Sequence, residues 1–543
     1  GGTGLGFDAF CIILDNICRE DSSLGGILFT NAAAQELLTA AQMRATEGAA
    51  MESGAVTGLD LMERAGQGLV AAVFAQWPEL ARGPHRAMVL SGPGNNGGDG
   101  FVVARLLAER GWAVEVLFFG GPDRLPPDAR TNHDRWGGVV RDLAAPGAMA
   151  GQPAPDLLVD ALFGTGLARP LGGPLVPVMA ETARMRAQGA RVVAVDLPSG
   201  LCSDSGRPLG GCFTVDLSVA FHRAKPGHHL AQGPAHCGRI VVAPIGLEDR
   251  KRGAGDPAGA VTLVDPEREA GAKAGVNHKY AHGHALVLSG GPGRTGAARL
   301  AARGALRIGA GLVTLGVPPA ALQEAAAQLT AIMLERVADV PALEKTLADD
   351  RINALCLGPA LGVSADRATL VAAALRCNRP TVLDADALTL ISGDAALLDL
   401  LHDTCVLTPH GGEFARLFPE IARKLDAPAT SAPAYGKVDA TREAARRAGC
   451  TVLFKGPDTV IASPGGACAI NSSAYDRAVP WLATAGSGDV LAGLVTGLLA
   501  RGLAPHRAAE TAAWLHTECA LSFGPGLIAE DIPERLPGVL RTL

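Results

Sequence analysis

Residues 91–101 read SGPGNNGGDGF and separate an apolar run, AMVL, from the amphipathic stretch VVARLLAERG. The spacing Gly92-x-Gly94-x-x-Gly97 is typical of the turn that joins a strand to a helix in dinucleotide-binding folds. A second stretch at 286–300, LVLSGGPGRTGAARL, has the same glycine spacing. The sequence therefore predicts two strand–loop–helix units in one chain.

A nicotinamide-dinucleotide fold also needs an acidic side chain at the end of the next strand, where it holds the ribose hydroxyls. That strand ends VLFFGG at 116–121 in the first half and LVTLGVPP at 312–319 in the second, and neither ending contains an acid. The sequence therefore argues against a standard dehydrogenase. The first loop instead carries Asn95, Asn96 and Asp99, which either contact a ligand or simply cap the turn.

Composition narrows the class of protein. A chain of 543 residues exceeds the roughly 100–250 residues of one domain, so we expect two α/β domains. The formal net charge of −6 argues against binding to nucleic acid or to an anionic membrane surface. Eleven cysteines without a C-x-x-C pair predict reduced thiols in a cytoplasmic protein. No apolar run reaches the ~18 residues that span a bilayer.

The order of predicted elements gives the domain organisation. Apolar strands alternate with helices in both halves, which predicts parallel sheets covered by helices, the first as a Rossmann-like three-layer sandwich. Ligands on such sheets bind where the strands end. A charged and then Gly/Pro-rich stretch is the best linker. We therefore predict a leader of unknown role at 1–35, a first domain at 36–247, a linker at 248–259 and a second domain at 260–543.

Four linked motifs in the first half are GPGNNGGDGFVVARLL, VDALFGTGL, VAVDLPSGL and AKPGH. In this order and spacing, residues 37–246 resemble the NAD(P)H-hydrate epimerase family. The second half, 259–543, resembles ADP/ATP-dependent NAD(P)H-hydrate dehydratase, which has a ribokinase-like fold. The motifs that carry this resemblance are GGPGRTGAARL, LGPALG, DADAL, TPHGGEFARLF, FKGPDTVIASP and LATAGSGDVLAG.

The two resemblances together imply a bifunctional repair enzyme for nicotinamide cofactors that have gained water across a ring double bond. The first domain would epimerise the R and S forms of NAD(P)HX. The second would dehydrate S-NAD(P)HX to NAD(P)H at the expense of ADP or ATP, and the sequence does not choose between the two nucleotides.

Epimerisation at a carbon that bears both nitrogen and hydroxyl needs proton transfer near a developing cation, so a carboxylate is the natural participant. Asp160 is our candidate catalytic residue and Asp196 is the other carboxylate at a strand end, although each could instead cap a loop. Lys225 either faces this site or lies in solvent. The adjacent His228 and His229 are a poor metal pair, because neighbouring residues rarely converge on one ion.

The resemblance also implies ligand contacts in the first domain. Its potassium ligands match Asn96, Asp160 and Ser199, an oxygen-donor set that suits a hard monovalent ion. Its substrate contacts match Asn95, Asn96, Gly97, Gly98, Asp99, Gly164, Thr165, Gly166, Leu167, Ala168, Arg169 and Asp196.

Hydroxide is a poor leaving group, so a kinase-like domain can phosphorylate the 6-hydroxyl before the ring nitrogen expels phosphate. Gly486, Ser487 and Gly488 would offer backbone N–H groups at a helix N-terminus. Asp489 would take the hydroxyl proton, or would only cap the helix. Mg²⁺ is expected beside the transferred phosphate.

The resemblance assigns the remaining contacts of the second domain. Substrate contacts match Ala297, Gly362, His410 and Asp489, and nucleotide contacts match Lys455, Gly456, Pro457, Asp458, Thr459 and Gly488. The family often has N-x-x-G-N before the GSGD loop, whereas the run 470–489 lacks that glycine. Nucleotide contacts between Asn471 and Leu482 therefore stay unassigned.

Two other functions compete with repair. One is a small-molecule kinase of the ribokinase-like fold fused to a non-catalytic epimerase-like binding module; it would release a stable phosphate ester, whereas a dehydratase releases inorganic phosphate. The other is a scaffold without catalysis, against which the joint retention of Asn96, Asp160 and Ser199 argues. We expect small-molecule substrates, a homo-oligomer, and neither nucleic-acid nor membrane partners.

Overall fold

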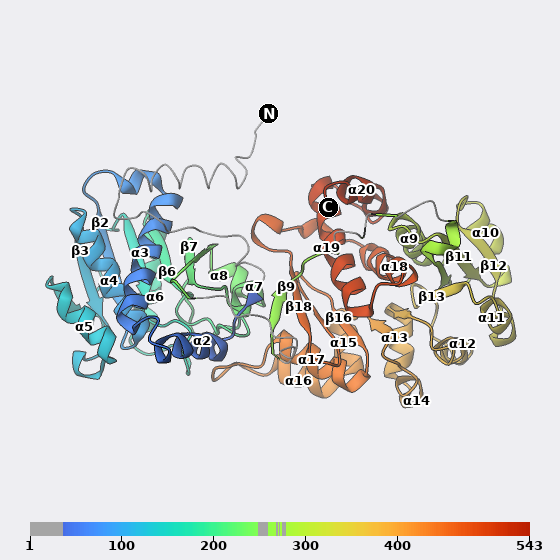
Figure 1. The fold of residues 1–543 in the computed structure, drawn as a ribbon, viewed down its shortest axis with the longest axis horizontal. Helices are drawn as coiled ribbons and strands as arrows, with labels where there is room; N and C mark the ends of the chain where they lie inside the picture. Colours follow the sequence, from blue (N-terminus) through green and yellow to red (C-terminus); the bar gives the residue numbers. More distant parts are fainter. Residues whose placement is uncertain (1–35, 248–258, 268–269, 271, 274–277) are drawn as a thin grey trace. The chain divides into compact units, whose positions relative to one another are not determined.

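The computed structural model describes residues 36–247, 259–267, 270, 272–273 and 278–543. The predicted leader and all of the predicted linker except Gly259 lie outside these residues. The chain divides into two compact units, residues 1–254 with 428–436, and residues 255–427 with 437–543 (Figure 1). The predicted domain boundaries stay a prediction, and each unit is described by itself.

The first unit contains a parallel seven-stranded sheet with the order β4-β3-β2-β5-β6-β7-β8. The chain runs outward from β2 to β4 and then returns to β5 on the other side of β2, so the strand order reverses between β2 and β5. Ligands bind at such a switch point. The strands are β2 (Arg86–Ser91), β3 (Ala113–Phe118), β4 (Val140–Asp142), β5 (Leu157–Ala161), β6 (Arg191–Val195), β7 (Leu217–Phe221) and β8 (Arg239–Ala243).

Helices cover both faces of this sheet and complete the predicted three-layer sandwich. Alternate strand residues enter two separate cores, because successive side chains of a strand point to opposite faces. Val89 packs with α3 and α4 on one face, and Leu90 packs with α6 on the other. The remaining elements are β1 (Glu36–Leu37), α2 (Ala40–Glu52), α3 (Gly58–Gln76), α4 (Asn95–Glu109), α5 (Pro127–Trp136), α6 (Leu175–Ala187), α7 (Pro226–His229) and α8 (Gly233–His236).

The sheet of the second unit has the order β9-β18-β17-β16-β15-β14-β13-β10-β11-β12. Most neighbours are parallel, as the alternation of strands and helices predicts. The pairs β16–β17 and β17–β18 are antiparallel, which the sequence reading missed. The strands are β9 (Val261–Leu263), β10 (His284–Leu288), β11 (Leu312–Val317), β12 (Met333–Arg336), β13 (Ile352–Leu357), β14 (Thr381–Leu383), β15 (Cys405–Leu407), β16 (Thr451–Phe454), β17 (Asp458–Ala462) and β18 (Cys468–Ser472).

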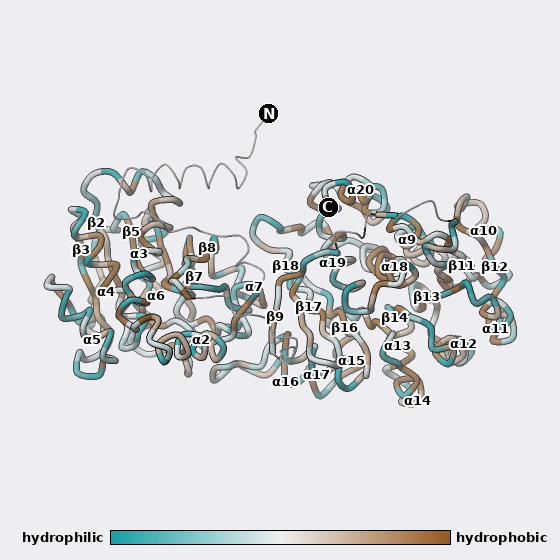
Figure 2. Tube along the Cα trace, viewed as in Figure 1, coloured by the Kyte–Doolittle hydropathy of each residue, from teal (hydrophilic) through white to brown (hydrophobic). Residues whose placement is uncertain are grey.

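Helix α18 is the central helix of the second unit, and every residue from Val490 to its end is buried. Figure 2 shows this helix as one of the most hydrophobic segments of the unit. Glycine lets α18 approach α9 closely, since a Cβ on Gly493 would lie 2.0 Å from the Ala301 carbonyl oxygen. The helices are α9 (Gly296–Arg307), α10 (Leu322–Ala326), α11 (Val340–Leu347), α12 (Ala365–Leu375), α13 (Ala385–Ser392), α14 (Ala395–Leu398), α15 (Gly411–Leu417), α16 (Pro419–Asp426), α17 (Lys437–Ala448), α18 (Ser487–Ala500), α19 (Pro505–Phe523) and α20 (Asp531–Leu540).

Within the part of the chain that the structure describes, no helix is long and apolar enough to cross a membrane. The nine cysteines in that part are free thiols, and most of them are buried.

Candidate active sites

The glycine-rich loop of the first unit is packed tightly against the ends of β2 and β5. A Cβ on Gly92 would lie 1.8 Å from the carbonyl oxygen of Leu162, and a Cβ on Gly97 would lie 1.9 Å from that of Gly92. Only glycine fits these two positions. Helix α4 already begins at Asn95, so the NNGGD residues form its first turn and not a free loop as predicted.

A cavity of about 480 Å³ lies beside this turn, at the carboxyl ends of β2, β5 and β6. The structure brings together at its wall the predicted contacts Asn95, Asn96, Asp99, Gly164, Thr165, Gly166 and Asp196. Five predicted contacts do not line it: Gly97, Gly98, Leu167, Ala168 and Arg169. Gly97, Gly98 and Leu167 are buried in the packing behind the wall.

Asp160 is completely buried beneath this cavity and does not line it. Its Oδ2 accepts a hydrogen bond from the Ser199 backbone N–H at 2.8 Å, and its Oδ1 accepts one from the Ser199 hydroxyl at 2.6 Å. Burial raises the pKa of Asp160 to about 6, although these hydrogen bonds act to lower it. The geometry therefore favours a supporting role for Asp160, whereas Asp196 at the end of β6 lines the cavity.

Two of the three predicted potassium ligands, Asp160 and Ser199, contact each other, and the Asn96 side chain lies against Gly164, the residue after Phe163. The single hydroxyl proton of Ser199 can satisfy only one of two oxygens within reach, Asp160 Oδ1 at 2.6 Å or Phe163 O at 3.1 Å. The Asn96 Nδ2 is buried without a hydrogen-bond partner. Exchanging the amide atoms of Asn96 would place an oxygen there, so these residues fit a hard monovalent cation.

Asp196 forms a buried ion pair with Lys225, which the sequence left open. The ammonium group of Lys225 contacts Asp196 Oδ1 and donates a hydrogen bond to the Phe221 carbonyl oxygen at 3.3 Å. Asp196 has a φ of 66°, a left-handed conformation that holds the carboxylate at the strand end. Lys225 therefore belongs to the site and is not a solvated surface residue.

His228 holds this pair in place, and hydrogen bonds occupy both of its ring nitrogens. Its Nδ1 accepts a hydrogen bond from the Lys225 backbone N–H at 2.9 Å, so Nε2–H donates to the Asp196 carbonyl oxygen at 3.0 Å. Burial lowers the pKa of His228 to about 3, which keeps the ring neutral. No group of three or more acidic, histidine or cysteine side chains in the described residues could hold a metal ion.

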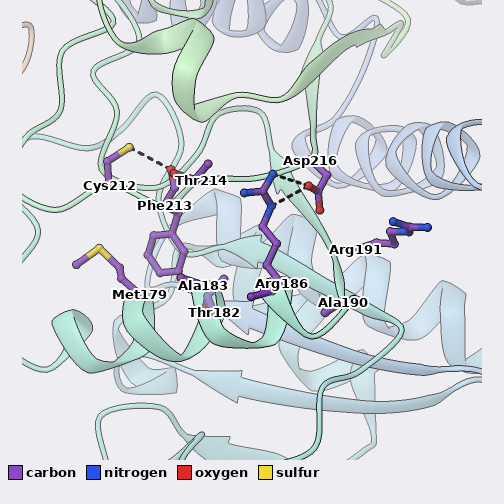
Figure 3. Close-up of a pocket in the computed structure, with 12 residues that line it drawn as sticks. Met179, Thr182, Ala183, Arg186, Ala190, Arg191, Cys212, Phe213, Thr214 and Asp216 are labelled. Carbon is purple, nitrogen blue, oxygen red and sulfur yellow. Dashed lines mark hydrogen bonds and ion pairs between the residues drawn. The ribbon is translucent and has the colours of Figure 1, made fainter.

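A second hollow of about 360 Å³ in the first unit lies at the opposite ends of the strands, beside the start of β6 (Figure 3). Its main charged groups satisfy each other, because Arg186 donates to Asp216 Oδ1 at 2.7 Å. It contains none of the predicted site residues. The chemistry of the first unit therefore belongs to the cavity beside α4.

In the second unit, the GSGD loop forms the N-terminus of α18 as predicted. Gly486 has a φ of 89°, and a Cβ there would lie 2.8 Å from the Leu300 side chain, so the position requires glycine. Asp489 lies in the first turn of the helix. Burial and the nearby Asp384 raise the pKa of Asp489 to about 6, a value suited to a general base near neutral pH.

Lys455 connects the predicted nucleotide segment to the carboxylates of the site. Its Nζ lies 2.7 Å from Asp384 Oδ1 and 3.8 Å from Glu413 Oε2. A Cβ on Gly488 would lie 3.4 Å from the same Nζ, so Lys455 and the GSGD loop are adjacent. Asp384 lies in the DADAL motif but had no predicted role. Only the fold brings this residue next to Lys455.

The other predicted contacts of the second unit surround this centre at strand and helix ends. The Gly362 N–H donates to Asp386 Oδ2 at 2.8 Å, and exposed His410 caps α15 by accepting from the Gly412 N–H at 3.0 Å. Lys455, Gly456 and Pro457 form the tight turn between β16 and β17, and Asp458 and Thr459 begin β17. Asp458 pairs with Lys437 at 2.7 Å.

The last predicted substrate contact of the second unit, Ala297, lies half-buried in the first turn of α9. In the unassigned run before the GSGD loop, Asn471 donates to Thr517 Oγ1 at 2.9 Å. Asn471 therefore ties β18 to α19, and the structure assigns it no ligand.

These two units define a class of protein, a two-domain α/β enzyme with a lysine–carboxylate site at the strand ends of each unit. Residues 58–227 match the family described as YjeF-related protein N-terminus, and residues 285–528 match the family described as NAD(P)H-hydrate dehydratase. The bifunctional NAD(P)H-hydrate repair enzyme of Moorella thermoacetica is 36% identical over 538 residues, covering 93% of this chain and 97% of that protein. The chain belongs to the family of bifunctional NAD(P)H-hydrate repair enzymes.

Other relatives match one half each. The NAD(P)H-hydrate epimerase of Roseobacter litoralis is 48% identical over 231 residues, covering 39% of this chain and 99% of that protein. A crystal structure of the ADP/ATP-dependent NAD(P)H-hydrate dehydratase of Bacillus subtilis is 26% identical, covers 51% of this chain and 94% of that one, and has a TM-score of 0.41. The full-length relatives support repair and not a kinase fused to a non-catalytic module.

Proposed function

We infer that the chain repairs hydrated nicotinamide cofactors. Its first domain epimerises R- and S-NAD(P)HX, and its second domain dehydrates S-NAD(P)HX to NAD(P)H. The observation that carries this conclusion is the match of nearly the whole chain to a bifunctional repair enzyme. Each half also has a lysine–carboxylate pair at the strand ends where the family motifs lie, the buried Lys225–Asp196 and the half-buried Lys455–Asp384.

In the epimerase site, we propose that Asp196 faces the reacting ring. When the hydroxyl leaves C6, the ring nitrogen N1 takes up positive charge as the C6=N1 double bond forms. The carboxylate of Asp196 stabilises this charge, and Lys225 and His228 fix its position through the buried contacts described above. Water then adds to either face of C6, which gives both epimers.

We propose that Asn96, Asp160 and Ser199 hold a potassium ion. The ion would supply positive charge that stabilises the oxygen atoms of these three side chains beneath the cavity. Because Ser199 also accepts a hydrogen bond from the Phe163 backbone N–H at 2.9 Å, these residues fix the loop that carries Gly164, Thr165 and Gly166. Asp160 then positions the wall of the cavity and does not itself exchange a proton with substrate.

In the dehydratase site, we propose that Asp489 takes the proton of the 6-hydroxyl while that oxygen attacks the terminal phosphorus of ADP or ATP. The bond from this phosphorus to the bridging oxygen breaks, and AMP or ADP leaves. N1 then expels phosphate from C6, and loss of a C5 proton restores the ring double bond. The backbone N–H groups of the GSGD turn and the Lys455 ammonium group bind the phosphates.

The centre around Lys455 also fits a divalent cation. The charges of Asp384, Asp386 and Glu413 all raise the pKa of Asp489, and Lys455 alone opposes them. Mg²⁺ typically takes one or two carboxylates and completes its shell with phosphate oxygens and water. We propose that Asp384 and Glu413 would hold the Mg²⁺ of the nucleotide, which would neutralise charge on the transferred phosphate.

The deciding experiment is the recovery of the absorbance of reduced nicotinamide when the purified chain meets an equilibrated mixture of R and S hydrates. We expect complete recovery with ATP or ADP and none without nucleotide. Recovery that stops at the S fraction would contradict the epimerase assignment, and no recovery with either nucleotide would contradict the dehydratase assignment. The expected homo-oligomer is tested separately by light scattering after size-exclusion chromatography.

A further inference from the structure

Helix α2 forms one wall of the epimerase cavity although it lies before residues 58–227, which match the family of the first unit. Arg44, Glu47 and Met51 line the cavity. Their spacing of three and four residues puts them on one face of the helix. Met43, one turn before Glu47, is buried in the core and anchors the helix. The helix therefore presents a fixed face to the substrate space.

Hydrogen bonds attach the start of α2 to the two chain segments that carry Lys225 and Asp196. The Leu38 N–H donates to the carbonyl oxygen of Ala224, the residue before Lys225, at 3.1 Å. The Ala40 N–H donates to Asp204 Oδ1 at 2.8 Å, on the loop that follows Asp196 and β6. A capping box at Thr39 closes the first turn of the helix. These bonds hold Glu47 at a defined place relative to the ion pair.

Glu47 faces a crowded set of charges in the cavity. Lys225 lies behind Asp196 from the strand side, Asp99 from α4 and Asp128 from α5 line the same cavity, and Arg44 lies at its exposed rim. Burial raises the pKa of Glu47, and the charge of Asp196 adds to this effect while Lys225 and Arg44 oppose it. No residue in the described part of the chain forms a hydrogen bond or an ion pair with the carboxyl group of Glu47. It is therefore available to substrate.

We propose that Glu47 is a further catalytic residue of the epimerase site, the acid that donates a proton to the 6-hydroxyl and takes it back when water returns. This inference rests on the proposed epimerase activity. In the forward step, the proton of the Glu47 carboxyl group moves to the hydroxyl oxygen on C6. The C6–O bond breaks with its electron pair on oxygen, water leaves, and the N1 lone pair closes the C6=N1 double bond.

The return step reverses each transfer. Water attacks C6 from either face, the C6=N1 electrons return to N1, and the proton lost by the water restores the carboxyl group of Glu47. Asp196 keeps its ion pair with Lys225 throughout. Asp196 thus stabilises the cation, and Glu47 transfers the proton.

The test compares Glu47→Gln with a matched control on the same helix, Glu52→Gln, whose side chain is exposed and outside the cavity. Each full-length variant is assayed for interconversion of R and S hydrate, with the uncatalysed rate subtracted. The calorimetric transition of the first unit reports that each variant is folded there, and the dehydratase rate on purified S hydrate with ATP reports that the second unit is unaffected. We expect Glu47→Gln to lower the epimerase kcat by about 10²–10⁴-fold with little change in KM, as for loss of a general acid.

Glu47→Asp keeps the acid but shortens its reach, so we expect it to retain part of the rate and the pH dependence that Glu47→Gln loses. The control should match the wild type in both activities. An epimerase kcat of Glu47→Gln within twofold of the wild type would overturn the proposal, and so would a rise in KM alone, which would make Glu47 a binding residue. Absence of epimerase activity in the wild type would instead overturn the proposed function.

Discussion

The buried ion pair of the first unit gives a prediction with a defined magnitude. The Lys225 side chain is 1% exposed and that of Asp196 is 10% exposed. Replacing Lys225 by Met removes the ammonium group and leaves a buried carboxylate without its counter-charge, which typically costs about 3–5 kcal/mol of unfolding free energy. For a unit of this size each kcal/mol lowers Tm by about 2–4 °C, so we expect a decrease of roughly 6–20 °C.

Differential scanning calorimetry of the full chain measures this effect, and the lowered transition should be the one of the first unit. The double variant Lys225→Met/Asp196→Asn should recover much of the loss, because no unpaired charge remains and asparagine tolerates the left-handed backbone of Asp196. As a control, Arg130→Met breaks exposed pairs with Asp123 and Asp134, each of which contributes at most about 1 kcal/mol. Additive losses in the double variant would refute the reasoning.

Three further predictions concern the reactions. Asp489→Asn should lower the dehydratase kcat by about 10²–10⁴-fold without affecting epimerisation. In the wild type this rate should rise with pH through about 6, since Asp489 must be ionised to accept a proton; a flat profile would contradict its role as base. Ser199→Ala should abolish the stimulation of epimerisation by potassium chloride relative to N-methylglucamine chloride, and an unchanged response would contradict the cation site. Lys455→Met should raise the KM for ATP by roughly 10–150-fold, the equivalent of one charge-assisted hydrogen bond, and an equal KM would exclude its contact with the nucleotide.

The strands of both units could be predicted because buried parallel strands are continuous apolar runs. The run AMVL lies inside β2, and the run at 312–317 is β11. The antiparallel turn after β16 was missed because TVLFKG and TVIASP are also apolar runs. Their separation by only Pro457 and Asp458 was the available signal, since a parallel crossover needs a dozen or more residues.

Site residues were predictable where a motif marks them and not where burial decides their role. Asp489 and the NNGGD turn lie at strand and helix ends that the sequence locates. Lys225 could not be assigned, because a lysine is normally exposed and its burial depends on Asp196, 29 positions earlier in the chain. Asp384 was missed for a similar reason: it reaches Lys455 across 71 positions, and only the order of strands β14 to β16 makes them neighbours.

The two glycine-rich loops share a spacing but not a reason for it. In the first loop, Gly92 and Gly97 are required because a Cβ would collide with backbone oxygens of the β5 end and of the turn itself. In the second loop, Gly291 and Gly293 have nothing within 4 Å of a Cβ position, and only Gly293 needs glycine for its φ of 73°. The spacing alone therefore contains no information about the ligand. The chemistry depends on the side chains at the ends of the neighbouring strands, which are Asp196 with Lys225 in one unit and Asp384 with Lys455 in the other. Neither set contains the ribose-binding acid of a dehydrogenase at its expected position.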